Sequence, residues 1–401
     1  RGLEMCIRDR SEDILRKQIR CLADIGFDAV KTGMLRSRRI VEIVAEELQE
    51  YDARVVIDPV MSAKTGAVLM DESAAEALVR LLVPDATVIT PNIPEAEKLL
   101  GMKIATIEDM RKAAKLFVEK MGCEAAVVKG GHLLGPKAID VLYYDGEFYM
   151  FEADRIETKN THGTGCTYSA AITAELAKGS DIPKAVELAK RLTHLSILYG
   201  LSIGGGYGPV NSMVWLYREA ERYSVLQQLS EAVEEIESAD AISKLIPEVG
   251  MNLAYALEYS VGKEDVAAIP GRIRNAMGKP KACCCPRFGA SRHLASYIMT
   301  ARKYDRDIRA AVNIRYDPSI VEKLRGMGLI IALYDRSKEP EEIKNVEGRT
   351  IPWGMEEAIR SAGLVPDVVY HLGDIGKEPM IVILGRSPKE LVRILKKIVM
   401  G

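Results

Sequence analysis

Short apolar runs alternate with longer segments of helical periodicity along the first half of the chain. The pattern predicts strands at residues 29–32, 54–57, 87–90 and 125–129, a hairpin at 138–151, and helices at 38–51, 107–121 and 167–178. An earlier helix, from Ser11, is expected to turn Ile14, Ile19, Leu22 and Ile25 inward. Such alternation builds a mostly parallel sheet with flanking helices, whose ligands lie at the carboxyl ends of the strands.

The regularity breaks at residues 203–209, IGGGYGP, and a Glu-rich helical segment follows at 213–240. We place a domain boundary in this region, between a first domain at 11–223 and a second at 224–401. Residues 1–10 show neither helical nor strand periodicity and are predicted to be a non-native or disordered end.

The second half repeats the alternation of strands and helices. Strands are predicted near residues 281–285, 310–314, 329–334, 368–370 and 380–384. Ser387 and Pro388 supply the start signal of a last helix, which places Leu391, Ile394, Leu395 and Ile398 on one face. The sequence therefore predicts a second, smaller α/β domain.

Composition narrows the class of protein. With 48% hydrophobic and 28% charged residues the chain has the composition of a folded globular protein, and its net charge of -2 offers no general attraction for nucleic acid or anionic lipid. No apolar run has the length of a membrane span and the first residues do not resemble a secretory signal, so a cytoplasmic protein is expected. The odd number of cysteines, 7, without a CxxC pair argues against a disulfide framework and a zinc site. Cys283, Cys284 and Cys285 are interpreted as strand residues that pack.

The segment Gly163-Thr164-Gly165-Cys166 is a candidate anion site. Its two glycines let backbone N–H groups converge at the start of a small-residue helix, where the helix dipole favours a phosphate or a developing oxyanion. A glycine turn beside a buried cysteine is the plain structural alternative.

Four polar residues lie at the ends of three predicted strands of the first domain. Asp58 follows one strand, Asn92 and Glu95 follow the next, and Lys129 ends a third. Carboxylates there can hold a metal–nucleotide, and lysine can reach phosphates. Taken singly, the carboxylates are equally well explained as helix caps and the lysine as a solvated strand end.

Six segments of the first domain carry a resemblance. KTGML at 31–35, DPVM, TPNIPEAE, KGGHL, THGTGCT and GYGPVN resemble, in this order, the bacterial and archaeal hydroxymethylpyrimidine/phosphomethylpyrimidine kinases of the ribokinase-like fold. The resemblance implies that Cys166 activates the acceptor and that Asp58 and Glu95 hold Mg²⁺. It further implies ATP binding by Asn92, Lys129, Gly163, Thr164 and Gly165, and a pyrimidine pocket lined by Met34 and Val60.

The sequence departs from that family in two places. The family's opening strand, with a Gly-Ser-Asp segment, and the strand after it have no counterpart before Ser11, so part of the pyrimidine pocket is expected to be missing and phosphorylation to be slow. Tyr207 stands where the family usually has histidine.

The second domain has its own candidate anion ligands. Ser291, Arg292 and His293 open a helix after a predicted strand, and Asn313 and Arg315 end the next strand. His371 and Lys377 flank a glycine-containing loop. Each feature alone is also explained as a capped helix or a surface turn.

The second domain resembles the thiamine-phosphate synthase domain that follows this kinase in archaea and some bacteria. The resemblance rests on IPEVGMNLAYAL, PGRI, PRFGASRH, NIRYDP, YDR, PWG and GDIGKEPM. It implies coupling of hydroxymethylpyrimidine diphosphate with thiazole phosphate. Arg292, Arg315, Lys377 and Mg²⁺ would stabilise the leaving diphosphate, Ser291 and Asn313 would contact substrate, and His293 and His371 would handle protons or phosphate.

Two alternatives stay open at this point. One is a pyridoxal-type kinase with a C-terminal domain that senses a thiamine precursor, although no helix-turn-helix or basic segment precedes Val225. The other is an inactive kinase half that serves as a scaffold. Small-molecule substrates and a homo-oligomer are the expected partners.

Overall fold

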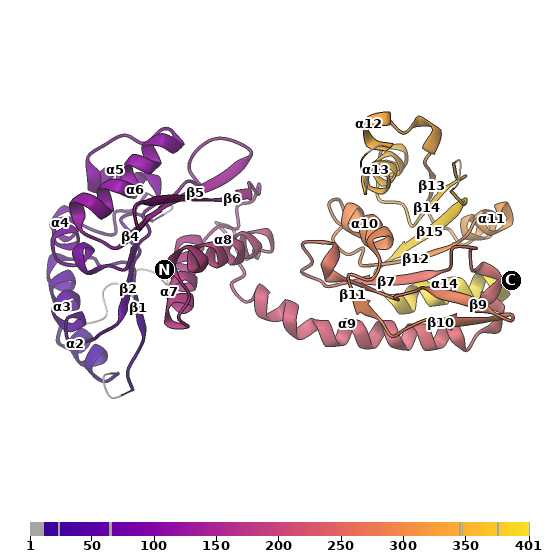
Figure 1. Ribbon diagram of the computed structural model, residues 1–401, viewed down its shortest axis with the longest axis horizontal. Coiled ribbons are helices and arrows are strands. Elements are labelled where there is room, and N and C mark those ends of the chain that lie inside the picture. The colour runs from indigo at the N-terminus through magenta and orange to yellow at the C-terminus, as the bar shows by residue number, and fades with distance from the viewer. Residues whose placement is uncertain are drawn as a thin grey trace. The chain divides into compact units, whose positions relative to one another are not determined.

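The computed structural model describes residues 12–22, 25–63, 66–344, 346, 348–374 and 377–400. Residues 1–10, predicted to be a non-native or disordered end, lie outside these ranges. The chain divides into two compact units between Trp215 and Leu216 (Figure 1). The division falls eight residues before the boundary expected from the sequence, because helix α9, Val214–Glu237, lies almost wholly in the second unit.

The first unit is built on a six-stranded sheet in the order β1-β2-β3-β4-β5-β6. Its strands are β1 (Ala29–Thr32), β2 (Arg54–Ile57), β3 (Val88–Ile89), β4 (Ala125–Lys129), β5 (Lys137–Tyr144) and β6 (Glu147–Asp154). Strands β1 to β4 run parallel, and β5 and β6 complete the sheet as an antiparallel hairpin. Asp145 and Gly146 form the two-residue turn of that hairpin with φ of 50° and 76°. The expected mostly parallel sheet is confirmed.

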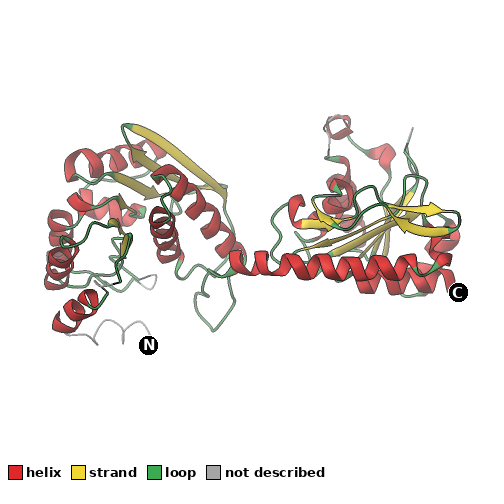
Figure 2. Cartoon of the chain, turned by 60° about the horizontal axis from the view of Figure 1, so that its bottom comes forward, coloured by secondary structure: helices red, strands yellow, loops and turns green. Residues whose placement is uncertain are grey.

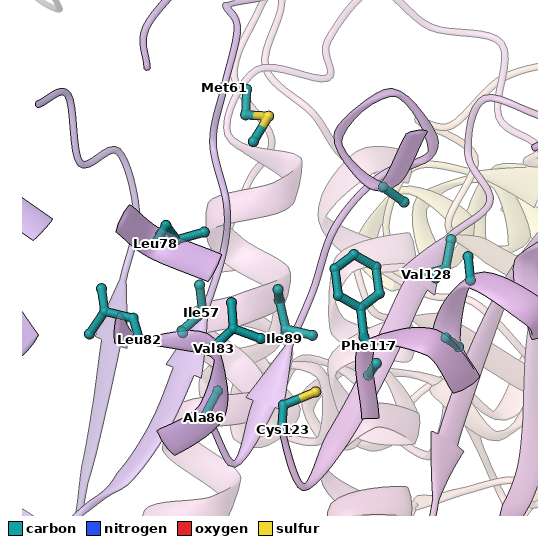
Figure 3. Packing of buried hydrophobic residues seen from close by; sticks show 14 of the residues in the cluster. Ile57, Met61, Leu78, Leu82, Val83, Ala86, Ile89, Phe117, Cys123 and Val128 are labelled. Atoms are coloured by element: carbon teal, nitrogen blue, oxygen red, sulfur yellow. The ribbon is translucent and has the colours of Figure 1, made fainter. Parts of the chain in front are cut away.

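Helices cover both faces of this sheet. They are α2 (Glu12–Arg20), α3 (Arg38–Leu48), α4 (Glu72–Leu81), α5 (Ile93–Leu100), α6 (Ile107–Met121), α7 (Thr164–Ala177) and α8 (Ile182–Leu198), with a 3₁₀ turn, η1, at Val83–Asp85. Successive strand residues point to opposite faces, so Ile57 joins the core beneath α3 to α6 while its neighbour Val56 joins the core beneath α7 and α8. Figure 3 shows the first of these cores, where Phe117 of α6 lies close to Ile89 and Cys123.

The first helix differs from its sequence prediction. Ile19 packs against the core with Leu15, but Ile14 is 41% exposed, and Leu22 and Ile25 are also exposed. The helix ends at Arg20, so the helical period that would have carried Leu22 and Ile25 inward does not continue.

The second unit is built on a seven-stranded sheet in the order β11-β8-β7-β12-β15-β14-β13. Its strands are β7 (Asn252–Ala256), β8 (Val266–Ala268), β11 (Arg287–Phe288), β12 (Ala310–Arg315), β13 (Ile331–Leu333), β14 (Val368–His371) and β15 (Met380–Gly385). Strands β9 (Ile273–Ala276) and β10 (Lys279–Ala282) form a separate hairpin. Only β13 and β14 pair in parallel within the large sheet; its other pairings are antiparallel.

Helices again cover both faces of the second sheet. Helices α9, α11 (Pro318–Gly326) and α14 (Pro388–Met400) pack on one face, and α10 (Arg292–Ala301) and α13 (Thr350–Ala362) on the other. Figure 2 shows α9 running along the sheet. The short elements are α12 (Glu341–Lys344) and the 3₁₀ turns η2 (Asp240–Leu245), η3 (Lys263–Asp265) and η4 (Arg336–Lys338). Ser387 caps α14 as predicted, and the predicted apolar face of that helix packs into the core.

The prediction that Cys283, Cys284 and Cys285 pack in a strand is wrong. Strand β10 ends at Ala282, and the three thiols lie in an exposed bend. In the described ranges, no cluster of three or more potential metal ligands is present, and no helix combines the length and apolar character of a membrane span.

Candidate active sites

Residues at the carboxyl ends of β1 to β4 meet at one edge of the first sheet, because these strands run parallel. Asp58 follows β2, and its Oδ1 lies 3.0 Å from Nζ of Lys129, the last residue of β4. Lys31 of β1 places its Nζ 3.7 Å from Oδ2 of the same carboxylate. Ser169 of α7 donates a hydrogen bond to Oδ2 over 3.3 Å. A buried carboxylate is therefore surrounded by two ammonium groups and a hydroxyl.

Asn92 and Glu95 form a capping box at the start of α5. The Asn92 side chain accepts from the Glu95 N–H over 2.9 Å, and Glu95 Oε2 accepts from the Asn92 N–H over 2.8 Å. Burial raises the pKa of Glu95, and the charge of Lys129 offsets part of that rise. Burial alone lowers the pKa of Lys129, but the negative charges of Asp58 and Glu95 outweigh it, so the net shift is upward. Glu95 thus caps a helix and belongs to the charged cluster.

Helix α7 begins beside this cluster. Gly163 precedes it with a φ of 84°, a left-handed conformation that favours glycine, and brings no capping side chain to the first turn. A Cβ on Gly165 would lie 3.4 Å from Lys129 Nζ and 3.6 Å from Asp58 Oδ2. Cys166 lies in the same first turn and is exposed. The helix N-terminus and the cluster therefore border one region.

A cavity of about 400 Å³ opens at this region. Of the residues singled out from the sequence, Asn92, Lys129, Thr164 and Gly165 line it; Asp58, Glu95, Gly163 and Cys166 are not among its lining residues. Met34 and Val60 follow the adjacent strands β1 and β2, are half-buried, and also do not line it.

Sequence reasoning missed an ion pair in the cavity wall. Lys190 of α8 donates to Asp140 of β5 over 2.8 Å, and both side chains are largely buried. Asp140 also accepts from the Gly130 N–H over 3.0 Å and lies opposite Lys129 in the β4–β5 register. The pair therefore holds the turn that follows Lys129. The sequence did carry signals of helix α8 itself. Asp181 is its N-cap, and Lys190 and His194, four residues apart, lie on one face of it.

The second unit contains a cavity of about 220 Å³. Its wall includes five site residues predicted from the sequence, Ser291, His293, Asn313, His371 and Lys377. It also includes three charged residues to which no site role was assigned, Arg272, Arg336 and Glu378. Glu378 is the one carboxylate of the lining, and its two oxygens accept from the backbone N–H groups of Glu248 and Val249. The free charge of the lining is therefore positive, which suits an anionic ligand.

The two histidines of this cavity are held neutral. Burial lowers the pKa of His371 to about 4, with a contribution from the charge of Arg336. The Gly373 N–H donates to Nδ1 of His371 over 3.2 Å, so that nitrogen carries no proton. Desolvation and the charge of Arg272 lower the pKa of His293 to about 4, although the residue as a whole is exposed. Neutral imidazoles can each donate one hydrogen bond and accept another.

Arg292 and Arg315 do not line the cavity. The expectation that both stabilise one leaving diphosphate placed them after two successive predicted strands. Strand β11, before Arg292, instead runs opposite to β12, which ends at Arg315, and β8 and β7 separate the two strands. Arg315 is half-exposed and pairs with Asp317 over 3.1 Å.

Asn313 and Arg272 are fixed by backbone contacts. Asn313 lines the cavity, but its amide donates to Gly250 O over 3.1 Å and accepts from the Asn252 N–H over 2.8 Å. Arg272 has a φ of 71° and donates to Val249 O over 2.7 Å. A left-handed arginine is a sparsely populated conformation that the surrounding structure must enforce. The Pro-Gly turn before Arg272 was the sequence signal for it.

Comparisons with known proteins divide the chain in the same way. The profile of the phosphomethylpyrimidine kinase family matches residues 5–211, and that of the family described as thiamine-phosphate synthase ThiN matches residues 228–397. The bifunctional thiamine biosynthesis protein ThiDN of Methanocaldococcus jannaschii is 32% identical over 387 residues, 96% of this chain and 85% of that relative.

Shorter matches cover the separate halves. The thiamine-phosphate synthase ThiN of Methanothermobacter thermautotrophicus is 43% identical over 173 residues, 43% of this chain and 91% of that relative. The solved pyridoxal kinase of Staphylococcus aureus in complex with AMP-PCP and pyridoxal is 36% identical; the match covers 51% of this chain and 74% of that structure, with a TM-score of 0.48.

Proposed function

Because the chain belongs to the family of bifunctional thiamine biosynthesis proteins, which join a phosphomethylpyrimidine kinase to a thiamine-phosphate synthase, we propose that its two cavities are the sites of successive reactions. The first unit transfers phosphate from ATP to hydroxymethylpyrimidine and its phosphate. The second unit couples the resulting diphosphate with thiazole phosphate and releases pyrophosphate. The product of the first unit is a substrate of the second.

In the kinase unit, Lys129 is placed to bind phosphate oxygens of ATP. Its ammonium group lies at the N-terminus of α7, where the N–H groups of the first helical turn have no partner within the helix. Asp140 and Lys190 keep the turn after Lys129 in position. Cys166, one residue beyond Gly165, is our candidate for activating the acceptor, because it is an exposed thiol in that first turn.

Asp58 and Glu95 fit a magnesium ion bound with the nucleotide. They are two buried carboxylates within each other's electrostatic influence, and Mg²⁺ is usually held by one or two carboxylates together with phosphate oxygens and water. When bound, the ion would neutralise charge on the transferring phosphoryl group. Asp58 and Glu95 would orient it, and Lys129 and Lys31 would supply the remaining positive charge on the protein side.

In the synthase unit, the bond between the pyrimidine methylene carbon and the diphosphate oxygen must break while negative charge builds on the diphosphate. Arg272 and Lys377 line the cavity and can stabilise that charge. The neutral rings of His293 and His371 can hydrogen-bond phosphate oxygens or the substrate amine. Arg292 and Arg315 do not line the cavity, and their catalytic roles remain predictions. This assignment rests on the composition of the cavity wall. Backbone N–H groups occupy both oxygens of Glu378, and the basic residues Arg272 and Lys377 line the same cavity.

The test supplies the full chain with hydroxymethylpyrimidine diphosphate and thiazole phosphate and measures thiamine phosphate. Arg272→Gln should lower the rate about a hundredfold, whereas Arg325→Gln, on α11 outside the lining, should leave it unchanged. Binding without product would instead support the sensor alternative.

A parallel assay with ATP compares hydroxymethylpyrimidine and pyridoxal as acceptors. Faster turnover of pyridoxal would contradict the kinase assignment. The expected homo-oligomer stays a prediction that light scattering will test.

A further inference from the structure

Arg336 lies at the wall of the synthase cavity and is almost completely buried. It begins the 3₁₀ turn η4 after β13, and only 8% of its surface is exposed. It lines the cavity together with Arg272, Lys377 and the two histidines. Its positive charge contributes to the low pKa of both His371 and His293, whose primary cause is burial.

The pairing of Arg336 is incomplete. Its nearest acidic partner is Glu339, with 3.8 Å between Nη2 and Oε2, longer than a hydrogen bond. Among the described residues, Arg336 Nε has no hydrogen-bond partner, and neither does Glu339 Oε1. A buried charge with unmet hydrogen bonds costs free energy unless another group completes it. Of this pair, Arg336 lines the cavity and Glu339 does not.

We propose that Arg336 binds a phosphate group of the pyrimidine diphosphate from within the cavity wall, and that Glu339 restrains its charge until the ligand arrives. This inference rests on the synthase function proposed for the second unit. A planar guanidinium that lines the cavity can offer two parallel N–H donors to a phosphate, a geometry that lysine lacks.

The role follows from the charge balance of the reaction. The methylene–oxygen bond breaks with its electron pair left on the diphosphate oxygen, and the lone pair of the thiazole nitrogen forms the new carbon–nitrogen bond. Pyrophosphate therefore leaves with one more negative charge than the diphosphate group carried as an ester. Arg336 would stabilise this added charge from a fixed position, because its surroundings are already ordered before substrate binds.

The experiment measures pyrophosphate affinity by calorimetry and thiamine phosphate formation, both on the full chain. Arg336→Gln combined with Glu339→Gln removes both charges while keeping two amides of similar shape, which avoids leaving a buried carboxylate alone. We expect this double variant to bind pyrophosphate at least about tenfold more weakly and to lose about a hundredfold in rate. Arg336→Lys should recover only part of either loss.

Glu339→Gln alone should change the pyrophosphate affinity in the opposite direction. It leaves the buried cation without its counter-charge, so pyrophosphate should bind more tightly than to the unaltered chain even if thermal stability falls. A purely structural ion pair would not strengthen anion binding when broken. The matched control is Arg325→Gln, which removes an exposed arginine outside the lining.

The outcomes separate the two proposals. If the unaltered chain binds pyrophosphate but makes no thiamine phosphate, the synthase assignment fails while the binding comparison still tests Arg336. If the chain makes thiamine phosphate and both the double variant and Glu339→Gln keep the original pyrophosphate affinity, Arg336 is not an anion ligand.

Discussion

At the scale of single residues, the surroundings of each thiol determine its reactivity. Cys123 is 2% exposed, and burial raises its pKa to about 12, so little thiolate exists at neutral pH. Cys166 is exposed at the start of α7, and Cys283, Cys284 and Cys285 are exposed in the second unit.

We therefore predict that alkylation modifies Cys166 and spares Cys123. ATP with hydroxymethylpyrimidine should protect Cys166 and leave labelling of Cys283 to Cys285 unchanged, as followed by peptide mass spectrometry. The three exposed thiols of the second unit are the internal control. Equal labelling of Cys166 with and without ligands would contradict its placement at the kinase site.

His371 should make the second unit sensitive to acid. Its pKa is about 4 when folded, against an ordinary value of 6.5, and its side chain is 3% exposed. The unfolded chain therefore binds the proton first as pH falls. The stability from this residue is complete above pH 6.5 and is lost progressively down to pH 4, by about 3 kcal/mol at most.

The measurement is urea unfolding of the second unit between pH 4 and 7. His371→Asn should reduce the slope, and replacing His293 by Asn as well should flatten it, because the pKa of both histidines is lowered to about 4. His194→Asn in the first unit should leave the slope unchanged. A slope that His371→Asn leaves undiminished would assign the effect to other groups.

At the scale of elements, the contact between α13 and the segment after β13 depends on a glycine. A Cβ on Gly354 of α13 would lie 2.4 Å from Cε2 of Tyr334, too close for any real contact. Tyr334 bonds the hydroxyl of Tyr297 over 2.9 Å, and its ring lies 5.3 Å from that of His371. The helix can therefore approach the cavity wall only where it carries no side chain.

Gly354→Ala should push Tyr334 toward His371 and cost about 1–3 kcal/mol of unfolding free energy. It should also weaken pyrophosphate binding, because the histidine ring moves. Gly326→Ala on α11 is the matched control, since no atom lies within 4 Å of its added methyl group. Thermal unfolding and calorimetry on the two variants give the answer, and equal behaviour would mean that Tyr334 can move without consequence.

At the scale of the whole molecule, each unit has its own hydrophobic cores. Those of the first unit lie on the two faces of its six-stranded sheet, and those of the second lie on the faces of its seven-stranded sheet. A relative that corresponds to the second half alone, the thiamine-phosphate synthase ThiN of Methanothermobacter thermautotrophicus, is matched over 91% of its length.

Residues 216–401 should therefore fold alone and form thiamine phosphate at a rate within about twofold of the full chain. ATP should raise the melting temperature of the full chain's first unit only, and pyrophosphate that of the second only. Failure of the isolated segment to fold, despite folding within the full chain, would contradict the division.

The sequence by itself determined the features that depend on near neighbours. Strands 54–57 and 125–129 and helix 107–121 form as predicted, because apolar spacing and capping residues act within a few positions. Lys129, Asp58, Asn92 and Glu95 were predicted as one group because parallel strands bring their carboxyl ends to one edge of the sheet. The capping alternative also holds for Asn92 and Glu95, which form a capping box, a local pattern.

Tertiary structure decided what depends on the partner of each strand. The order of the second sheet brings Arg272, Arg336 and His371 to one cavity and leaves Arg292 and Arg315 outside its lining. Asp140 and Lys190 meet only because β5 pairs with β4 and α8 packs over it. Local periodicity carries no information on pairing direction or register, since both are fixed by contacts between residues far apart in the chain.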